Sequence, residues 1–282
     1  MTKLIPQRVA ITGASGGIGR ALALYYAQHG ATALVLAGRN EKALRMTASL
    51  CEKAGAAAEV GVFDVRDAAV FDAWIDRVTT ADDLTHLIFC HGVSSSVSVT
   101  AAGPKPETTW EMRRELDVNA VSTVSAANRA AGNLLPQLRE TPGRRVQIGL
   151  TASLAALTGL PSSPAYSASK AAVVTFGEAL RRLTRGSGLG VTVALPGFVT
   201  SPMSRRYLGK KLFEVTAENA AQRIAEGLDN DRRQVVFPKV LAWGMRLLAW
   251  VPERWQGRFL APFAFAVADD EETRAVKEAS WQ

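Results

Sequence analysis

Short apolar runs alternate with longer amphipathic segments from Val9 to Phe237. Continuous apolar runs without alternating polar positions are typical of strands buried on both faces of a parallel sheet. The segments between them repeat their apolar residues every three or four positions, which predicts helices. We predict strands over Val9–Thr12, Ala33–Ala37, Glu59–Phe63, Leu87–Cys90, Arg145–Ile148, Val191–Leu195 and Gln234–Phe237, and helices over Gly19–His29, Glu41–Lys53 and Ala68–Val78. This order of elements predicts one α/β domain with helices on both faces of the sheet.

Composition narrows the class of protein without changing that prediction. The chain has 282 residues, of which 48% are hydrophobic and 21% charged, enough for a well-buried core. Cys51 and Cys90 are the only cysteines and lack metal-ligand spacing, so we expect no metal site and a reducing compartment. The start of the chain, Met1–Arg8, lacks the apolar stretch of a signal peptide, and no run reaches the ~18 apolar residues of a membrane span. We therefore expect a soluble, cytoplasmic protein.

The net charge of +7 favours anionic ligands such as phosphates. The sequence contains no motif of a nucleic-acid-binding module, so we expect no nucleic-acid partner.

Composition changes after Phe237. Four of the six Trp fall in the last 40 residues, and residues 232–262 carry six Lys or Arg against one acid, Glu253. We expect residues 1–237 to form the catalytic domain and residues 238–282 an amphipathic helical extension of it.

Trp243, Leu247 and Trp250 recur at helical spacing in this extension, beside Arg246. Such a stripe is most often buried or turned toward another subunit, which is the interpretation we favour. Aromatic residues flanked by cations also suit a membrane surface, so peripheral contact through residues 238–265 is the alternative.

A glycine-rich segment, TGASGGIG at residues 12–19, joins the first predicted strand to the first helix. Gly13, Gly17 and Gly19 allow a tight turn and a close approach of backbone to a pyrophosphate at the helix N-terminus. Further along, Tyr166 and Lys170 lie four residues apart and share one helix face. A nearby ammonium is expected to lower the pKa of a phenol from its free value near 10.

The two motifs together, TGxxxGIG and YSASK, resemble the short-chain dehydrogenase/reductase family in its short, single-domain branch, over about residues 9–237. The resemblance implies a Rossmann-like, doubly wound parallel sheet of seven strands, an NAD(P)(H)-dependent oxidoreductase, and a homodimer or homotetramer. It assigns proton transfer to Tyr166, orientation of the substrate oxygen to Ser153, ribose binding and tuning of the phenol to Lys170, and a water in the proton relay to Asn119.

One segment departs from the family pattern. The family usually has Asn-Ala-Gly after the fourth strand, where this chain has Cys90, His91 and Gly92. Gly92 keeps the close backbone approach, but the loss of the Asn side chain puts the local bracing of the sheet in doubt. We expect His91 to line the cofactor groove through its backbone, with a role as general base as the alternative.

The end of the second predicted strand bears on the choice of cofactor. No acid follows it until Glu41, whereas Arg39 offers a cation suited to the 2′-phosphate of NADP. We therefore expect NADP(H) to be preferred over NAD(H), although Arg39 alone could be a solvated surface residue. By resemblance the cofactor contacts are Gly13, Ser15, Gly17, Ile18, Gly19, Arg39, Asp64, Val65, Gly92, Tyr166, Lys170, Pro196, Gly197, Val199 and Thr200.

These assignments imply reduction of a ketone or other carbonyl compound, with an apolar 3-oxoacyl, steroid or lipid-like substrate. Substrate specificity is expected in Ser201–Lys211 and in the C-terminal extension. Oxidation of alcohols with NAD(P) and a non-catalytic NADP-binding regulator are the alternatives. A sugar-nucleotide epimerase or dehydratase is disfavoured, because such enzymes need a longer substrate domain and a different glycine spacing.

Overall fold

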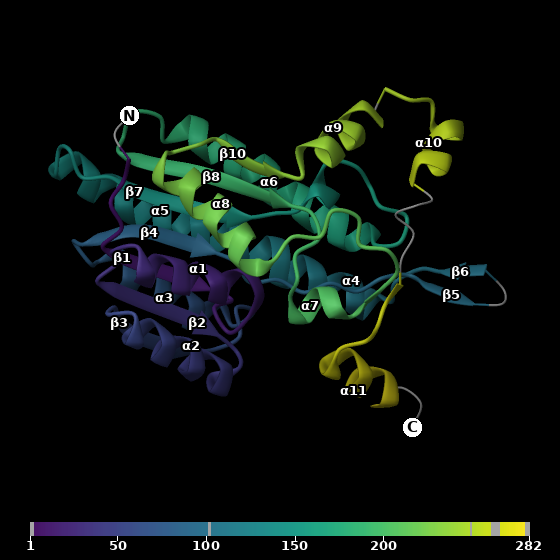
Figure 1. Ribbon diagram of the computed structural model, residues 1–282, viewed down its shortest axis with the longest axis horizontal. Coiled ribbons are helices and arrows are strands. Elements are labelled where there is room, and N and C mark those ends of the chain that lie inside the picture. Colours follow the sequence, from purple (N-terminus) through teal and green to yellow (C-terminus); the bar gives the residue numbers. More distant parts are fainter. Residues whose placement is uncertain (1–2, 101–102, 249, 261–265, 280–282) are drawn as a thin grey trace.

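The protein is described by a computed structural model, covering residues 3–100, 103–248, 250–260 and 266–279. Its centre is a sheet of seven parallel strands in the order β10-β8-β7-β4-β1-β2-β3 (Figure 1). These strands are β1 (Arg8–Thr12), β2 (Ala33–Gly38), β3 (Ala57–Val62), β4 (Leu84–Phe89), β7 (Val146–Thr151), β8 (Leu189–Pro196) and β10 (Gln234–Phe237). The strand order reverses between β1 and β4, and ligands of open α/β sheets bind outside the strand ends at such a crossover.

Helices cover both faces of the sheet. One face carries α1 (Gly17–Gln28), α2 (Glu41–Lys53) and α8 (Ala217–Asp229), and the other carries α3 (Ala68–Thr79), α5 (Ser122–Glu140) and α6 (Pro164–Leu183). Shorter helices complete this part of the chain: α4 (Thr109–Glu115), a π-helical turn (Leu116–Val121), a 3₁₀ turn (Leu154–Ala156) and α7 (Pro202–Arg205). The doubly wound arrangement agrees with the expected fold class.

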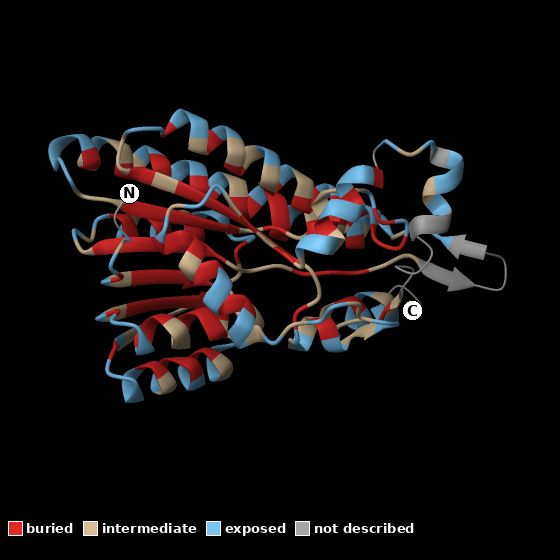
Figure 2. Ribbon diagram, turned by 45° about the horizontal axis from the view of Figure 1, so that its top comes forward, coloured by how far each residue is buried: buried red, intermediate tan, exposed pale blue. Residues whose placement is uncertain are grey.

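The core is divided by the sheet into two apolar clusters. Successive strand residues point to opposite faces, so Val9 and Ile11 pack under α1 and α8 while Ala10 packs under α3 and α5. Figure 2 shows the inner strands buried along most of their length and the helices exposed on their outer sides. The edge strand β3 is the exception, with no buried residue. Burial on both faces accounts for the continuous apolar runs in the sequence.

The hydrophobic pattern predicted all seven strands and the first three helices, with ends that differ by at most three residues. The largest differences are at the end of β7, which reaches Thr151 rather than Ile148, and at the start of β4, which begins at Leu84 rather than Leu87. Thr85 and His86 interrupt the apolar run, yet both are buried because they are paired with other groups. Thr85 Oγ1 donates to the Arg8 carbonyl at 3.1 Å, and His86 Nε2 lies 3.2 Å from Asp229.

Helices α4, α5, α7 and α8, two small ladders and the three helices of the C-terminal extension were not predicted individually. The ladders are β5 (Ser98–Thr100) with β6 (Gly103–Lys105), and β9 (Tyr207–Leu208) with β11 (Ala266–Val267). The C-terminal helices are α9 (Lys239–Leu248), α10 (Glu253–Leu260) and α11 (Glu271–Ala279). None of the helices in the described residues is both long and apolar enough to cross a bilayer.

The tryptophan stripe is not buried within this chain, so a contact with another subunit, the other part of that expectation, stays a prediction. Helix α9 packs on the core through Ala242, Met245 and Leu248. Trp243 is 63% exposed and Trp250 is 88% exposed. Both sets of residues recur at helical spacing, and the sequence pattern alone could not tell which set packs inward.

Helix α6 lies so close to the sheet that its Gly177 has no room for a methyl group. A Cβ there would lie 2.5 Å from Val193 and 2.8 Å from Leu150. We predict that Gly177→Ala lowers the free energy of unfolding by about 1–3 kcal/mol, because this overpacking outweighs the gain in helix propensity. Urea denaturation measures it.

Gly132, inside α5, is the matched control, because its Cβ would meet nothing within 4 Å. Gly132→Ala should raise stability by up to about 1 kcal/mol. Equal effects at the two positions would contradict the close helix–sheet contact.

Candidate active site

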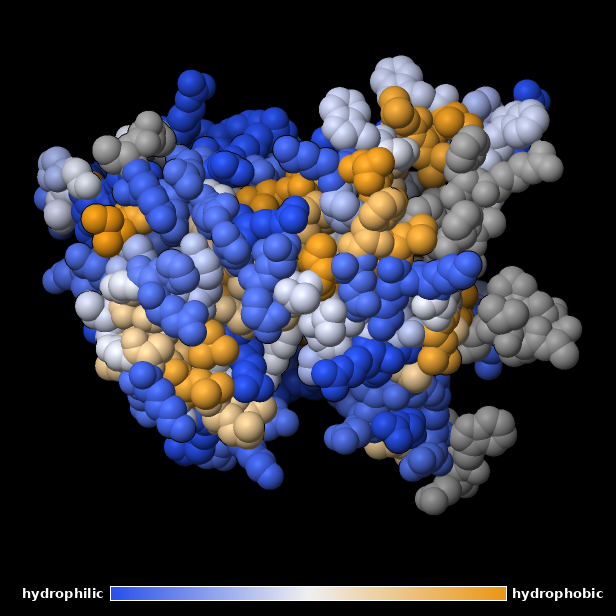
Figure 3. Space-filling view, in the orientation of Figure 1, coloured by the Kyte–Doolittle hydropathy of each residue, from blue (hydrophilic) through white to orange (hydrophobic). Residues whose placement is uncertain are grey.

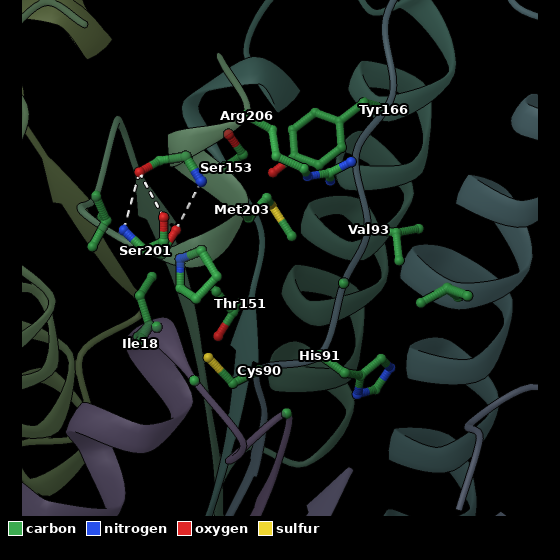
Figure 4. A pocket seen from close by; sticks show the side chains of 18 of the residues that line it. Ile18, Cys90, His91, Val93, Thr151, Ser153, Tyr166, Ser201, Met203 and Arg206 are labelled. Atoms are coloured by element: carbon green, nitrogen blue, oxygen red, sulfur yellow. Dashed lines mark hydrogen bonds between the residues drawn. The ribbon is translucent and has the colours of Figure 1, made fainter. Parts of the chain in front are cut away.

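A cavity of about 1270 Å³ opens at the carboxyl ends of the parallel strands. Most of the predicted cofactor contacts line it: Gly13, Ser15, Gly17, Ile18, Arg39, Asp64, Val65, Gly92, Tyr166, Lys170, Pro196, Gly197 and Val199. Ser153 lines it as well (Figure 4). Residues separated by more than 180 positions in the chain therefore meet around one space.

The glycine-rich loop between β1 and α1 forms the floor of the cavity. Gly13 and Gly17 have φ values of 71° and 54°, a region that other residues rarely adopt. A Cβ on Gly13 would lie 2.7 Å from the His91 backbone nitrogen, so β1 and β4 continue into loops in direct contact. The N-terminus of α1 behind this loop has no acidic residue in its first turn, and its free N–H groups suit a phosphate.

Tyr166 and Ser153 form the opposite wall. Tyr166 lies in the first turn of α6, which Pro164 begins and where Glu107 accepts a hydrogen bond from the Ala165 N–H at 3.0 Å. Ser153 follows β7 and caps the 3₁₀ turn by accepting from the Ala155 N–H at 3.2 Å. Both side chains line the cavity, and the Ser153 hydroxyl acts to lower the pKa of the Tyr166 phenol. Their hydroxyl groups are therefore close enough to contact one substrate oxygen.

The electrostatics of Tyr166 differ from the expectation. Burial raises the pKa of its phenol well above the usual value, with Tyr207 and Glu115 adding to the effect and the Ser153 hydrogen bond opposing it. The Lys170 ammonium lies 5.8 Å from the Tyr166 ring centroid and donates to the Thr151 carbonyl at 2.9 Å. The expected lowering of the phenol pKa by Lys170 is wrong for the chain by itself, because removal from water outweighs a cation that faces another acceptor.

Burial also changes the pKa of Lys170. Its side chain is 4% exposed, and removal from water lowers the pKa of the ammonium to about 8. It thus remains charged at neutral pH, beside the cavity and one helical turn beyond Tyr166.

Asn119 lies behind the cavity wall rather than among its lining residues. It sits in the π-helical turn, and its carboxamide both accepts from the Val93 N–H at 2.8 Å and donates to the Val93 carbonyl at 2.9 Å. A further bond to Ser169 Oγ at 3.1 Å reaches α6. Its side chain therefore braces the loop that follows β4 against the helix that carries Tyr166.

His91 supplies the local bracing of the sheet that the absence of the family's Asn side chain had put in doubt. Its Nδ1 lies 2.6 Å from Thr12 Oγ1, and its Nε2 lies 3.0 Å from Ser122 Oγ and 3.1 Å from Thr123 Oγ1. Figure 4 shows the ring turned toward the neighbouring helices and away from Ser153. Burial lowers the pKa of His91 to about 3. With both nitrogens engaged, it is no general base, and its side chain ties β1 to α5.

Two predicted cofactor contacts do not line the cavity. Gly19 lies under the loop, where a Cβ would be blocked by the Gly13 carbonyl, so its role is to permit packing. Thr200 is exposed and donates its N–H to the Val215 carbonyl at 2.9 Å, whereas Val199 and Ser201 on either side do line the space. A contact between Thr200 and the cofactor therefore stays a prediction.

Sequence reasoning missed a group of charged residues at the mouth of the cavity. Asp270 and Glu272, from the C-terminal segment, line the same space as Gly13 and Tyr166, together with Arg114 and Arg206. These residues have no motif, and their proximity depends on the packing of the last described residues across the cavity.

Comparison with known proteins agrees with this geometry. The family model for short chain dehydrogenases matches residues 7–211. An uncharacterised oxidoreductase of Myxococcus xanthus is 33% identical over 257 residues, which are 89% of this chain and 95% of that protein. The chain belongs to the short-chain dehydrogenase/reductase family. It is accordingly an NAD(P)-dependent oxidoreductase that acts on carbonyl or alcohol groups of small molecules.

Other members of the family carry more specific names. The ketoacyl reductase HetN of a Nostoc species is 28% identical over 243 residues, covering 84% of this chain and 80% of that protein. The 11-beta-hydroxysteroid dehydrogenase A of Sesamum indicum is 34% identical over 232 residues, covering 80% and 59%. A Burkholderia phymatum family member solved with NAD superposes with a TM-score of 0.75 at 24% identity, over 89% of this chain and 95% of that one. That last likeness shows the fold.

The buried state of His91 makes a testable difference to stability. Its pKa of about 3 in the folded protein lies below the free value near 6.5, so below pH 6.5 the unfolded chain binds a proton that the folded chain does not. Its contribution to stability is complete above pH 6.5 and is lost as the pH falls. We predict that between pH 7 and pH 5 the wild-type protein loses about 1–2 kcal/mol more unfolding free energy than His91→Asn.

Urea denaturation at the two pH values measures this difference. His29→Asn, at an exposed position after α1, is the matched control and should keep the wild-type slope. Equal slopes for the wild type and His91→Asn would show that the imidazole takes up protons in the folded state.

Proposed function

We propose that this protein reduces an apolar ketone to an alcohol with NADPH, using Tyr166 as the proton donor. The observation that carries the proposal is the placement of Tyr166, Ser153 and Lys170 around one cavity at the strand ends, with a buried phenol that is protonated at neutral pH. A protonated phenol can donate to a carbonyl oxygen as negative charge develops there, whereas oxidation of an alcohol needs a proton acceptor. Hydride transfer to the carbonyl carbon is the chemistry that a bound nicotinamide supplies.

The other members of the site have supporting roles in this proposal. Ser153 lines the cavity together with Tyr166, which suits it to hold the substrate oxygen within reach of the phenol. Lys170, charged at neutral pH, faces the cavity and can donate to a ribose hydroxyl while stabilising the phenolate left after proton transfer. Asn119 acts through Val93 and Ser169 and is a positioning residue.

A preference for NADP(H) is supported by the cations at the end of β2. Arg39 lines the cavity beside Asp64, and Arg66 lies next to both. Guanidinium groups match the geometry of a phosphate better than they match a ribose hydroxyl. The cavity runs along the strand ends past the glycine loop and Gly92, neither of which places a large side chain in it.

An apolar substrate is supported by the wall around Tyr166. The side chains that line this part of the cavity are mainly apolar: Val93, Leu154, Leu160, Phe198, Met203, Leu241 and Met245. The last two come from α9, so residues 238–282 are proposed to extend the catalytic domain of residues 1–237 and to help select the substrate. The ketoacyl and steroid substrates in the names of two relatives are of this apolar class.

The exposed side of α9 is the proposed contact with a second copy of the chain. Val240, Trp243, Leu247 and Trp250 are each at least 60% exposed. Figure 3 shows apolar residues gathered at the upper right, where Figure 1 places α9. Large aromatic residues at the centre of a patch are typical of homodimer interfaces, and a two-fold axis would pair this face with itself.

We predict that Tyr166→Phe lowers kcat for reduction about 10²–10⁴-fold, because it removes the proton donor and leaves the ring in place. The measurement is the rate of NADPH consumption with ketones graded from small and polar to large and apolar. The rate of NADH consumption is measured with each of the same ketones for comparison. The Kd for NADPH should change little.

Tyr25→Phe, on the outside of α1, is the control and should keep full activity. Turnover that survives in Tyr166→Phe would remove Tyr166 from its proposed role. Faster turnover with NADH, or with the small polar ketones, would overturn the proposed cofactor or substrate class.

We predict that Trp243→Glu lowers the oligomeric state in size-exclusion chromatography with light scattering, because two-fold contact would bring the new charges together in an apolar interface. Met46→Glu, at an exposed apolar position on α2, should leave the assembly intact. A wild-type monomer that floats with anionic phospholipid vesicles would instead assign this face to a membrane surface.

A further inference from the structure

The carboxylate of Glu272 lies among three guanidinium groups at the mouth of the cavity. It is 3.0 Å from Arg39, 2.9 Å from Arg66 and 3.0 Å from Arg114. The three arginines come from different parts of the core, after β2, after β3 and from α4, while Glu272 comes from α11. Partial burial opposes its ionisation, but the arginines hold the pKa of this carboxyl below its usual value.

The segment before Glu272 is anchored across the cavity. Asp270 pairs with Arg114 at 2.6 Å and with Arg206 at 3.5 Å. The Ala268 N–H donates to the Arg206 carbonyl at 2.8 Å, and the Val267 N–H donates to Ser96 Oγ at 2.8 Å. These bonds hold Glu272 against the same Arg39 that was predicted to bind a 2′-phosphate.

The charges around Arg39 do not balance. Arg39, Arg66, Arg114 and Arg206 bring four positive charges, against three from Glu272, from Asp270 and from Asp64, which lies 3.6 Å from Arg39. A phosphate dianion carries more charge and more acceptor oxygens than a carboxylate, so it can replace Glu272 among these guanidinium groups. A ribose hydroxyl carries no charge and cannot.

We propose that Glu272 is a determinant of cofactor selectivity, which occupies the guanidinium groups that the 2′-phosphate of NADP(H) needs and is displaced when that phosphate binds. This rests on the proposed use of NADP(H). Binding of the 2′-phosphate then has to break the ion pairs of Glu272, whereas binding of NAD(H) leaves them intact. Glu272 therefore weakens the binding of NADP(H) but not of NAD(H), and so reduces the preference for NADP(H) that the arginines create.

The test measures binding to the complete chain by calorimetry, with two probes that differ only in the group of interest: adenosine 2′,5′-bisphosphate and adenosine 5′-monophosphate. Glu272→Gln should bind the bisphosphate about tenfold more tightly than the wild type, with no change for the monophosphate. Glu278→Gln, an exposed acid on the same helix, is the matched control and should bind both probes as the wild type does. Arg39→Gln removes a cation instead of an acid, so it should weaken the binding of the bisphosphate and leave the binding of the monophosphate unchanged.

The outcomes separate this inference from the proposed function. If Arg39→Gln weakens the bisphosphate while Glu272→Gln leaves it unchanged, the NADP(H) site stands and the role of Glu272 is wrong. If no variant, Glu272→Gln included, binds the bisphosphate more tightly than the monophosphate, the proposed NADP(H) preference and the inference both fail.

Proteolysis gives a second readout that needs no variant. Arg274 is exposed, and the displacement of Glu272 should make the chain around it more accessible to trypsin. Cleavage after Arg274 should therefore be faster with the bisphosphate than with the monophosphate. Equal rates with saturating bisphosphate would show that α11 keeps its place and would overturn the displacement.

Discussion

At the crossover between β1 and β4, the backbone of Gly13 lies against the peptide that joins Cys90 to His91. This contact is possible only because Gly13 has no side chain, and it fixes where the glycine-rich loop turns into α1. The imidazole of His91 stabilises this contact through hydrogen bonds to Thr12 with one nitrogen and to α5 with the other. The position of every other part of the site depends on this junction, since the loop, the strand end and the helix N-terminus meet there.

The catalytic wall is built on the same junction. The chain that leaves β4 is held by Asn119 through Val93, and Asn119 also reaches Ser169 on the helix that carries Tyr166. A π-helical turn inserts Asn119 into this position, and such turns are frequent at functional sites. Burial of the ionisable groups here has a direct chemical consequence. It keeps the phenol of Tyr166 protonated, and it lowers the pKa of Lys170 to about 8.

At the mouth of the cavity, residues from distant segments change the charge around Arg39 from what the local sequence predicts. From the sequence, Arg39 has no acid close by and is predicted to be a free cation that can bind a phosphate. In the folded chain an acid does reach it, from a position 233 residues further along. The charge that a ligand meets there is the sum over a connected set of ion pairs from five separate segments: Arg39, Asp64 with Arg66, Arg114, Arg206, and Asp270 with Glu272.

The sequence by itself determined the α/β class, the seven strands and the residues that carry the family resemblance. Those features depend on short-range constraints: continuous apolar runs, glycines that a tight turn requires, and a pair four residues apart on one helix. Tertiary structure decided which face of α9 packs inward, because two sets of apolar residues in that helix have equivalent spacing. It also decided that His91 braces the sheet, that Thr200 misses the cavity, and that the phenol pKa rises rather than falls. Each of these depends on burial and on partners from distant segments, and neither quantity is encoded in the spacing of residues along the chain.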